Sequence, residues 1–230
     1  MADKRPKNPL ALAVLTLLFE EPMHPYQMST TLKERAKEQS IKLNYGSLYA
    51  VVESLEKRGY VLAKETVAEG RRPERTVYAI TESGTRLMDE WLRDLLANPI
   101  NEFPQFEAAL SLIAVLPPED VIELLEKRLA TQSANYAKDT ALIQQVIDLG
   151  MPRLFAVEHE YEMALVKAEI DYVTTLLDDL KNDTISGMRF WRRMADLRAE
   201  GMPPEEIRAK VTDEFKEDFT WVEKAQEIKK

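Results

Sequence analysis

The chain has 230 residues, 45% hydrophobic and 31% charged, a balance that is typical of a folded protein and excludes an intrinsically disordered one. It has no cysteine, which excludes disulfides and thiolate metal sites and fits a cytoplasmic protein. The net charge of −9 is uneven: residues 1–100 carry 15 Lys and Arg against 14 Asp and Glu, whereas residues 101–230 carry 16 against 26. The acidity of the whole chain therefore does not exclude a nucleic-acid-binding module in its first part.

An apolar run, Leu10 to Phe19, follows the basic residues Lys4, Arg5 and Lys7. It is too short to cross a membrane, which takes about 20 residues, and it lacks the cleavage pattern of a signal peptide. We interpret it as a buried helix over residues 9–20.

Two further helices are expected next, over residues 25–38 and 45–58. Asn44 suits the N-cap of the later one and Gly59 its C-terminal end. Its apolar residues recur with helical period: Leu48, Val51, Val52 and Leu55.

The pattern then changes to that of a hairpin. Residues 60–67 and 75–80 read as strands, with a turn over 69–74 between them. Thr81 suits the N-cap of a fourth helix over 82–97. Three helices followed by a two-stranded wing is the order of a winged helix-turn-helix within a mainly α fold, in which the second helix of the motif enters the major groove of DNA.

The helix over residues 45–58 is the expected DNA-reading element. With Leu48 turned to the core, a helical projection points four residues away from it: Gly46, Ala50, Glu53 and Lys57. Glycine and alanine let the backbone approach the groove, while Ser47 and Tyr49 can donate hydrogen bonds to phosphates or base edges. Glu53 either accepts from a cytosine amino group or pairs with Lys57. For Tyr49, half-buried packing remains the alternative.

Arginines gather in the turn of the hairpin and suit phosphate contact or a narrow minor groove, since they cannot help a core. The residues expected to contact DNA are Tyr45, Gly46, Ser47, Tyr49, Ala50, Lys57, Arg71, Arg72 and Arg75.

Asn98-Pro99 marks the expected end of the first domain, residues 1–98. Beyond it the pattern is helical, and we expect a dimerisation arm over 99–183 and a further helical tail over 184–230. The helices of the arm are expected over residues 104–115, 118–149 and 152–182. The tail either packs against the arm or supplies an additional dimer or effector element.

A heptad-like seam indicates that the arm is an antiparallel or coiled-coil-like dimerisation domain. The expected dimer residues are Met163, Val166, Ile170, Val173, Leu177 and Leu180. Two helices cannot bury both of their faces alone, so a second copy of the chain is the expected partner.

Several motifs resemble those of the PadR family of transcriptional regulators, over about residues 9–97. They are Leu15–Leu18 before His24-Pro25-Tyr26, Tyr45-Gly46-Ser47-Leu48-Tyr49, Leu55-Glu56 with Gly59-Tyr60-Val61, and Gly70-Arg71-Arg72 leading to Tyr78–Gly84. Residues 155–180 look like the C-terminal arm of the longer members. The resemblance implies a homodimeric, usually repressing regulator that binds duplex DNA and leaves it when an aromatic or drug-like effector binds.

The sequence contains no glycine-rich phosphate loop, nucleophile elbow or metal-ligand set, so we expect no enzyme, cofactor, metal site or membrane partner. The segment Glu158–Glu162 lacks the second histidine of a zincin, and His159 is interpreted as a core or interface histidine that could make dimerisation sensitive to pH. The rival function is a winged-helix module that binds protein. An effector pocket, whose residues the sequence does not identify, would draw on aromatic residues such as Tyr26, Phe103, Phe106, Phe155 and Trp191.

Overall fold

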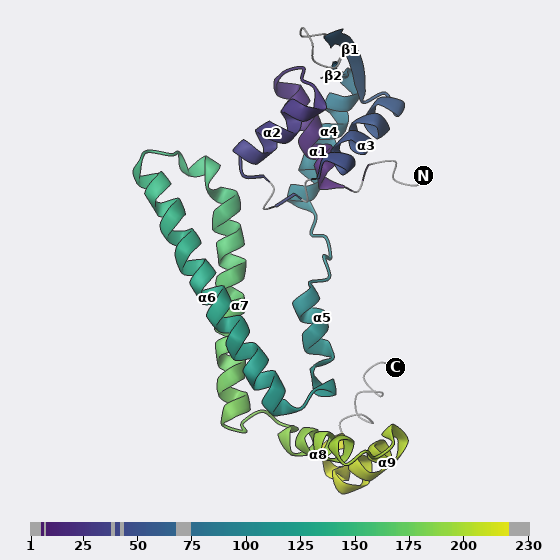
Figure 1. The fold of residues 1–230 in the computed structure, drawn as a ribbon, viewed down its shortest axis with the longest axis vertical. Coiled ribbons are helices and arrows are strands. Elements are labelled where there is room, and N and C mark those ends of the chain that lie inside the picture. The colour runs from purple at the N-terminus through teal and green to yellow at the C-terminus, as the bar shows by residue number, and fades with distance from the viewer. Residues whose placement is uncertain (1–5, 7, 38–39, 42–43, 68–74, 221–230) are drawn as a thin grey trace. The chain divides into compact units, whose positions relative to one another are not determined.

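The computed structural model describes residues 6, 8–37, 40–41, 44–67 and 75–220, in two compact units, Met1–Glu102 and Phe103–Lys230 (Figure 1). The first unit contains α1 (Pro9–Glu20), α2 (Pro25–Glu34), α3 (Tyr45–Lys57), β1 (Val61–Val67), β2 (Arg75–Ile80) and α4 (Glu82–Ala97). The predicted order of three helices, a two-stranded antiparallel wing and a fourth helix is confirmed.

The core of the first unit is built around α1. Leu10, Val14 and Leu15 are 0% exposed, as expected of a helix that is apolar on nearly all sides. The other helices add buried residues to the same cluster, among them Met28 and Leu32 of α2, Leu48, Val52 and Leu55 of α3, and Leu87 and Trp91 of α4. The interpretation of the first apolar run as a core helix is therefore confirmed.

The N-caps predicted for α3 and α4 are both present. The side chain of Asn44 accepts a hydrogen bond from the backbone N–H of Ser47 at 2.7 Å, and the Thr81 hydroxyl accepts one from Gly84 at 3.1 Å. Gly59, with φ of 74°, ends α3 in the left-handed conformation that glycine adopts without strain. These local signals fix where α3 begins and ends, and hence which of its side chains face outward.

Helix α2 is shorter than the predicted 25–38, because the chain leaves the helix at Ala36. This residue has φ of 54°, and the N–H groups of Ala36 and Lys37 donate to the carbonyls of Lys33 and Leu32 at 2.9 Å each. These bonds form a Schellman C-cap with alanine in the position that usually holds glycine.

Replacing Ala36 with glycine should raise the free energy of unfolding by about 0.5–1 kcal/mol, because the left-handed conformation costs alanine more than the extra chain entropy of glycine. Urea unfolding measures the difference. The matched change Ala50→Gly, within the right-handed helix α3, should lower the stability by about 1 kcal/mol. A destabilised Ala36→Gly protein would contradict the assigned C-cap.

The second unit is helical throughout its described residues. It contains α5 (Gln105–Ser111), η1 (Ile113–Val115), α6 (Pro118–Asp148), η2 (Arg153–Phe155), α7 (Val157–Lys181), α8 (Met188–Ala199), α9 (Pro204–Glu214) and η3 (Lys216–Phe219). The helix expected over 152–182 begins only at Val157, because Pro152 opens a separate 3-10 turn. The helix expected over 104–115 is divided at Leu112 into α5 and the 3-10 helix η1.

Helices α6 and α7 run side by side as an antiparallel pair (Figure 1). Their packed end is closed by α8 from the tail, and the shared cluster consists of Val121, Leu125, Val173, Leu177, Leu180, Met188 and Trp191. The indole Nε1 of Trp191 donates to the carbonyl of Leu116 at 2.8 Å, and Arg192 pairs with Glu119 at 3.1 Å. A smaller cluster joins α8 to α9 through Leu197, Ile207 and Val211. The described part of the tail is therefore integral to this unit.

None of the helices in the described residues is long and apolar enough to cross a membrane.

Candidate nucleic-acid interface

Helix α3 turns one face to the core and leaves the opposite face open. Leu48, Val52 and Leu55 are at most 1% exposed. On the other side Gly46, Ala50, Glu53 and Lys57 are exposed, and Ser47 is half-buried. Tyr45 begins the helix, but its side chain lies outside the described residues. The small side chains near the start of α3 leave room for its backbone to enter a groove of a partner molecule.

Tyr49 is 54% exposed, so most of its ring is not used in packing. It directly follows the core residue Leu48 in α3, and it lines a surface cavity that is described below. This exposure disfavours the packing alternative for Tyr49.

Lys57 and Glu53 form an exposed ion pair along α3, with 2.7 Å between Nζ and Oε1. The hydrogen bond and charge of Lys57 lower the pKa of the Glu53 carboxyl, and Glu53 raises the pKa of Lys57 in return. An exposed pair of this kind contributes little to stability, so Lys57 can exchange its partner for a phosphate at low cost. Of the two roles weighed for Glu53, local pairing is the one observed.

The wing is an antiparallel pair in which Val61 faces Ile80 and Val67 faces Arg75, with an irregularity between Ala63 and Glu65. Met23, ahead of α2, bridges Tyr78 and ties the wing to the helical core. Arg71 and Arg72 lie outside the described residues.

Several hydrogen bonds hold the start of α4 against the end of α3 and the start of β1. The backbone N–H of Thr81 donates to the Tyr60 carbonyl at 3.0 Å, and the Ser83 hydroxyl donates to the Gly59 carbonyl at 2.9 Å. Gly84 approaches so closely that a Cβ there would lie 2.1 Å from the Tyr60 carbonyl oxygen. The segment 81–84 therefore has a structural role: it holds the start of α4 against the junction between α3 and β1.

Arg75 reaches back from the wing to the start of α2. Its Nη1 lies 3.4 Å from His24 Nε2, and its guanidinium lies over the Tyr26 ring at 5.3 Å. These groups surround a cavity of about 200 Å³ that joins α2, α3 and the wing. Its lining residues are His24, Pro25, Tyr26, Tyr49, Arg75, Thr76 and Tyr78.

Sequence reasoning singled out Arg75 and Tyr49 but assigned no role in this cavity to His24 or Tyr78. The available signal was the pair His24-Pro25, because a residue that can accept a hydrogen bond, followed by proline, is typical of a helix start. That pair gives no indication that the wing lies close to His24.

The residues expected at the dimer seam divide into two groups. Met163, Val166 and Ile170 are half-buried. The remaining three, Val173, Leu177 and Leu180, are at most 4% exposed, within the protomer's own cluster. For these three the expectation changes, because the side chains they would offer a partner are already covered by α6 and α8.

The apolar side chains that α6, η2 and α7 leave exposed lie elsewhere in the arm. They include Leu142, Leu149, Leu154, Phe155, Tyr161, Leu165 and Tyr172, each more than half exposed. Large exposed apolar side chains at this density are typical of surfaces that meet another protein.

His159 lies on α7 with its Nδ1 3.7 Å from a carboxylate oxygen of Glu162. Its Nε2 is buried and has no hydrogen-bond partner within the described chain. No group of three or more acidic or histidine side chains in the described segments is placed to hold a metal ion.

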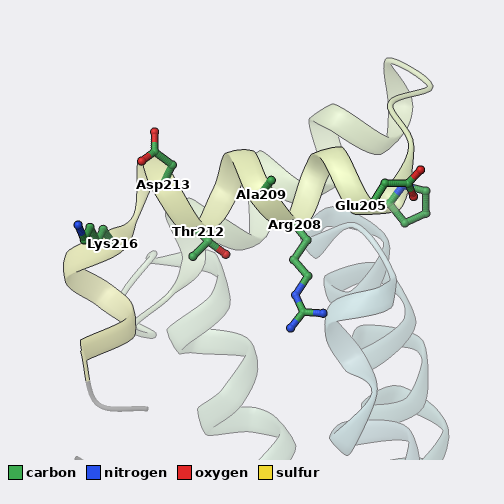
Figure 2. A pocket seen from close by; sticks show the side chains of 7 residues that line it. Glu205, Arg208, Ala209, Thr212, Asp213 and Lys216 are labelled. Carbon is green, nitrogen blue, oxygen red and sulfur yellow. The ribbon is translucent and has the colours of Figure 1, made fainter. Parts of the chain in front are cut away.

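Two of the aromatic residues considered for an effector pocket, Phe106 and Trp191, pack in the same helical cluster. Phe106 lies under the guanidinium of Arg128, at 3.7 Å from its ring centre, and Trp191 is in the helical cluster described above. Phe103 and Phe155 are 78% and 70% exposed. A shallow hollow on α9 is formed by Pro204, Glu205, Arg208, Ala209, Thr212, Asp213 and Lys216. Figure 2 shows the labelled side chains spread along α9 and the start of η3 and pointing in different directions, so they do not enclose a ligand.

The geometry of the first unit agrees with comparisons to known proteins. Residues 14–90 match the model of the transcriptional regulator PadR-like family. No curated protein matches the chain.

Solved structures match over most of the chain. Bacillus subtilis PadR in complex with operator DNA is 18% identical with a TM-score of 0.59, over 76% of this chain and 99% of that one. The same regulator in complex with p-coumaric acid gives 16% and 0.57, over 75% and 98%. The Vibrio cholerae virulence activator AphA gives 18% and 0.57, over 75% and 98%. At these identities the structures show a shared fold, and the match to the PadR-like family model covers residues 14–90.

Proposed function

We propose that the protein is a sequence-specific transcriptional regulator that binds duplex DNA with α3 in the major groove and the wing on the backbone. The observation that carries the proposal is the open face of α3, where Gly46, Ser47 and Ala50 lie beside the exposed ring of Tyr49. The wing arginine Arg75 lines the same cavity as Tyr49, so helix and wing present one surface. The operator complex of Bacillus subtilis PadR supports this reading.

The proposed contacts are those expected from the sequence: Tyr45, Gly46, Ser47, Tyr49, Ala50 and Lys57 on α3, and Arg71, Arg72 and Arg75 of the wing. Competition between a duplex from upstream of the protein's own coding sequence and a scrambled duplex tests the proposal. We expect the first to bind at least 10³-fold more tightly, as specific sites usually do. Equal affinity for both would contradict sequence-specific recognition.

Tyr49→Phe should weaken DNA binding about tenfold and leave the melting temperature unchanged, because the proposed contact is made by the hydroxyl of this half-exposed residue and the ring is kept. Fluorescence anisotropy gives the affinity and circular dichroism the melting temperature. Arg93→Gln is a matched control on α4, where Arg93 pairs with Asp89 at 2.8 Å. If Tyr49→Phe binds DNA as tightly as the wild type, Tyr49 has a packing role instead.

We also propose that the protein acts as a homodimer and a repressor on a pseudo-palindromic operator. The exposed apolar side chains of α6, η2 and α7 support a second copy as partner, with Met163, Val166 and Ile170 at its edge. Recognition helices about one DNA turn apart, roughly 34 Å, would read the two half-sites. Analytical ultracentrifugation should find a dimer at micromolar concentration, and monomer alone would contradict this assembly.

A small aromatic or drug-like effector is proposed to release the DNA. The support is the complex of Bacillus subtilis PadR with p-coumaric acid. Screening of aromatic acids against the DNA complex should find a compound that lowers DNA affinity, and compounds that bind the protein without changing that affinity would contradict the coupling.

The second candidate function is a winged-helix module that binds a protein partner and not DNA. The charge of residues 101–230, with 16 Lys and Arg against 26 Asp and Glu, favours it. A folded dimer that binds no duplex at low salt would support this candidate.

A further inference from the structure

The cavity between α2 and the wing contains two hydrogen-bond donors directed at each other. His24 is the N-cap of α2, and its Nδ1 accepts the backbone N–H of Gln27 at 3.0 Å. An imidazole nitrogen that accepts a hydrogen bond carries no proton, so the proton of the neutral ring is on Nε2. The cap therefore fixes the tautomer of His24 and makes Nε2 a donor.

Nε2 faces another donor, because Arg75 Nη1 lies 3.4 Å away and a guanidinium cannot accept. The two groups cannot bond to each other. Two donors at this separation instead suit a single acceptor oxygen placed within reach of both. In the part of the chain that the structure describes, no carboxylate forms an ion pair with Arg75, so the acceptor is expected from outside.

The cavity also has a hydroxyl donor and a helix start beside it. Burial raises the Tyr78 pKa, and so do the nearby carboxylates of Glu56 and Glu53 and the hydroxyl of Tyr49, so the Tyr78 hydroxyl keeps its proton and can donate. The two carboxylates oppose an anion, although Glu53 is already paired with Lys57. The helix α2 begins beside the cavity and directs its positive dipole end there. With Tyr49 54% and Tyr26 51% exposed, a ligand on the protein surface can enter.

We propose that this cavity is a phosphate-binding site in which His24 Nε2–H and Arg75 Nη1–H donate to one phosphate of the DNA backbone. The inference rests on the proposed function and adds α2 to the DNA-binding surface. A phosphate fits better than a base edge, since it offers several acceptor oxygens and a charge to match several donors and one guanidinium.

The test uses His24→Asn, because asparagine is among the best N-cap residues and keeps α2 capped while its side chain lacks the Nε2 donor. Anisotropy on the upstream duplex across a salt series should show about tenfold weaker binding at every salt concentration, since a neutral donor is lost and no cation is removed. Arg75→Gln should lower the magnitude of the salt slope by about one. The double variant should bind no more than about threefold more weakly than Arg75→Gln, because both donors serve one phosphate.

Arg93→Gln, in the same duplex and buffer, is the matched control and should retain both affinity and slope. If His24→Asn is folded and binds DNA as tightly as the wild type, the site is overturned while the proposed function stands. If the wild type binds no duplex at all, the proposed function itself fails.

A second titration separates DNA phosphate from free phosphate. Inorganic phosphate added to the DNA-free protein should shift the ring resonances of His24 only weakly, at millimolar concentration, and not in Arg75→Gln. Micromolar phosphate binding, together with normal DNA affinity of His24→Asn, would assign the cavity to free phosphate and overturn the proposal.

Discussion

Gly84→Ala should destabilise the winged-helix unit by about 3 kcal/mol or more and lower its melting temperature by roughly 10 °C or more. The new Cβ would lie 2.1 Å from the Tyr60 carbonyl oxygen and 2.8 Å from Ile80 Cγ1. The carbonyl belongs to backbone at the start of the wing, so α4 would have to shift and break the bonds that Thr81 makes there. DNA binding should be lost with the fold.

Calorimetry measures this effect, and Gly46→Ala supplies a matched control. A Cβ on Gly46 meets only the Asn44 side chain, at an ordinary 3.7 Å, in the right-handed helix α3. That variant should be as stable as the wild type or slightly more so. It should nevertheless bind DNA more weakly if the backbone of α3 approaches the groove at this point. A Gly84→Ala protein with the wild-type melting temperature would contradict the described packing of α4.

Trp191→Ala should cost about 3–5 kcal/mol in the stability of the helical unit, the usual range for removing a large buried aromatic side chain. Trp191 is 7% exposed and packs among residues of α6 and α7. Trp191→Phe keeps the packing and loses only the bond to the Leu116 carbonyl, so about 1 kcal/mol is expected.

Urea unfolding followed by circular dichroism gives both values. The winged-helix unit should keep its own transition, because Trp191 contributes nothing to the core around α1. Equal stability of Trp191→Ala and the wild type would mean that α8 is not needed by the arm.

The first unit could be predicted in detail because its signals are local. The cap residues Asn44 and Thr81 act within three positions, and the alternation of the wing is visible in the strands themselves. The predicted end of α2 was wrong, because Ala36 adopts a left-handed conformation that alanine disfavours.

For the arm, the sequence predicts the helices and an apolar stripe along them, but not how they pack. A heptad pattern shows that one face is buried but not what buries it, and for Val173, Leu177 and Leu180 the partner is the same chain. The docking of α8 depends on contacts such as Trp191 with Leu116, which are 75 positions apart. Likewise, His24 and Arg75 are 51 positions apart, so their facing donors could not be inferred from either segment.

The most direct test of the account is the anisotropy of the wild-type protein on its upstream duplex across a salt series. Lys57, Arg71, Arg72 and Arg75 are the proposed phosphate contacts of each winged-helix unit. The logarithm of affinity should therefore fall linearly with the logarithm of salt concentration, with a slope near −0.9 for each phosphate neutralised. A folded protein that shows no binding even at low salt would contradict the proposal that this surface reads DNA.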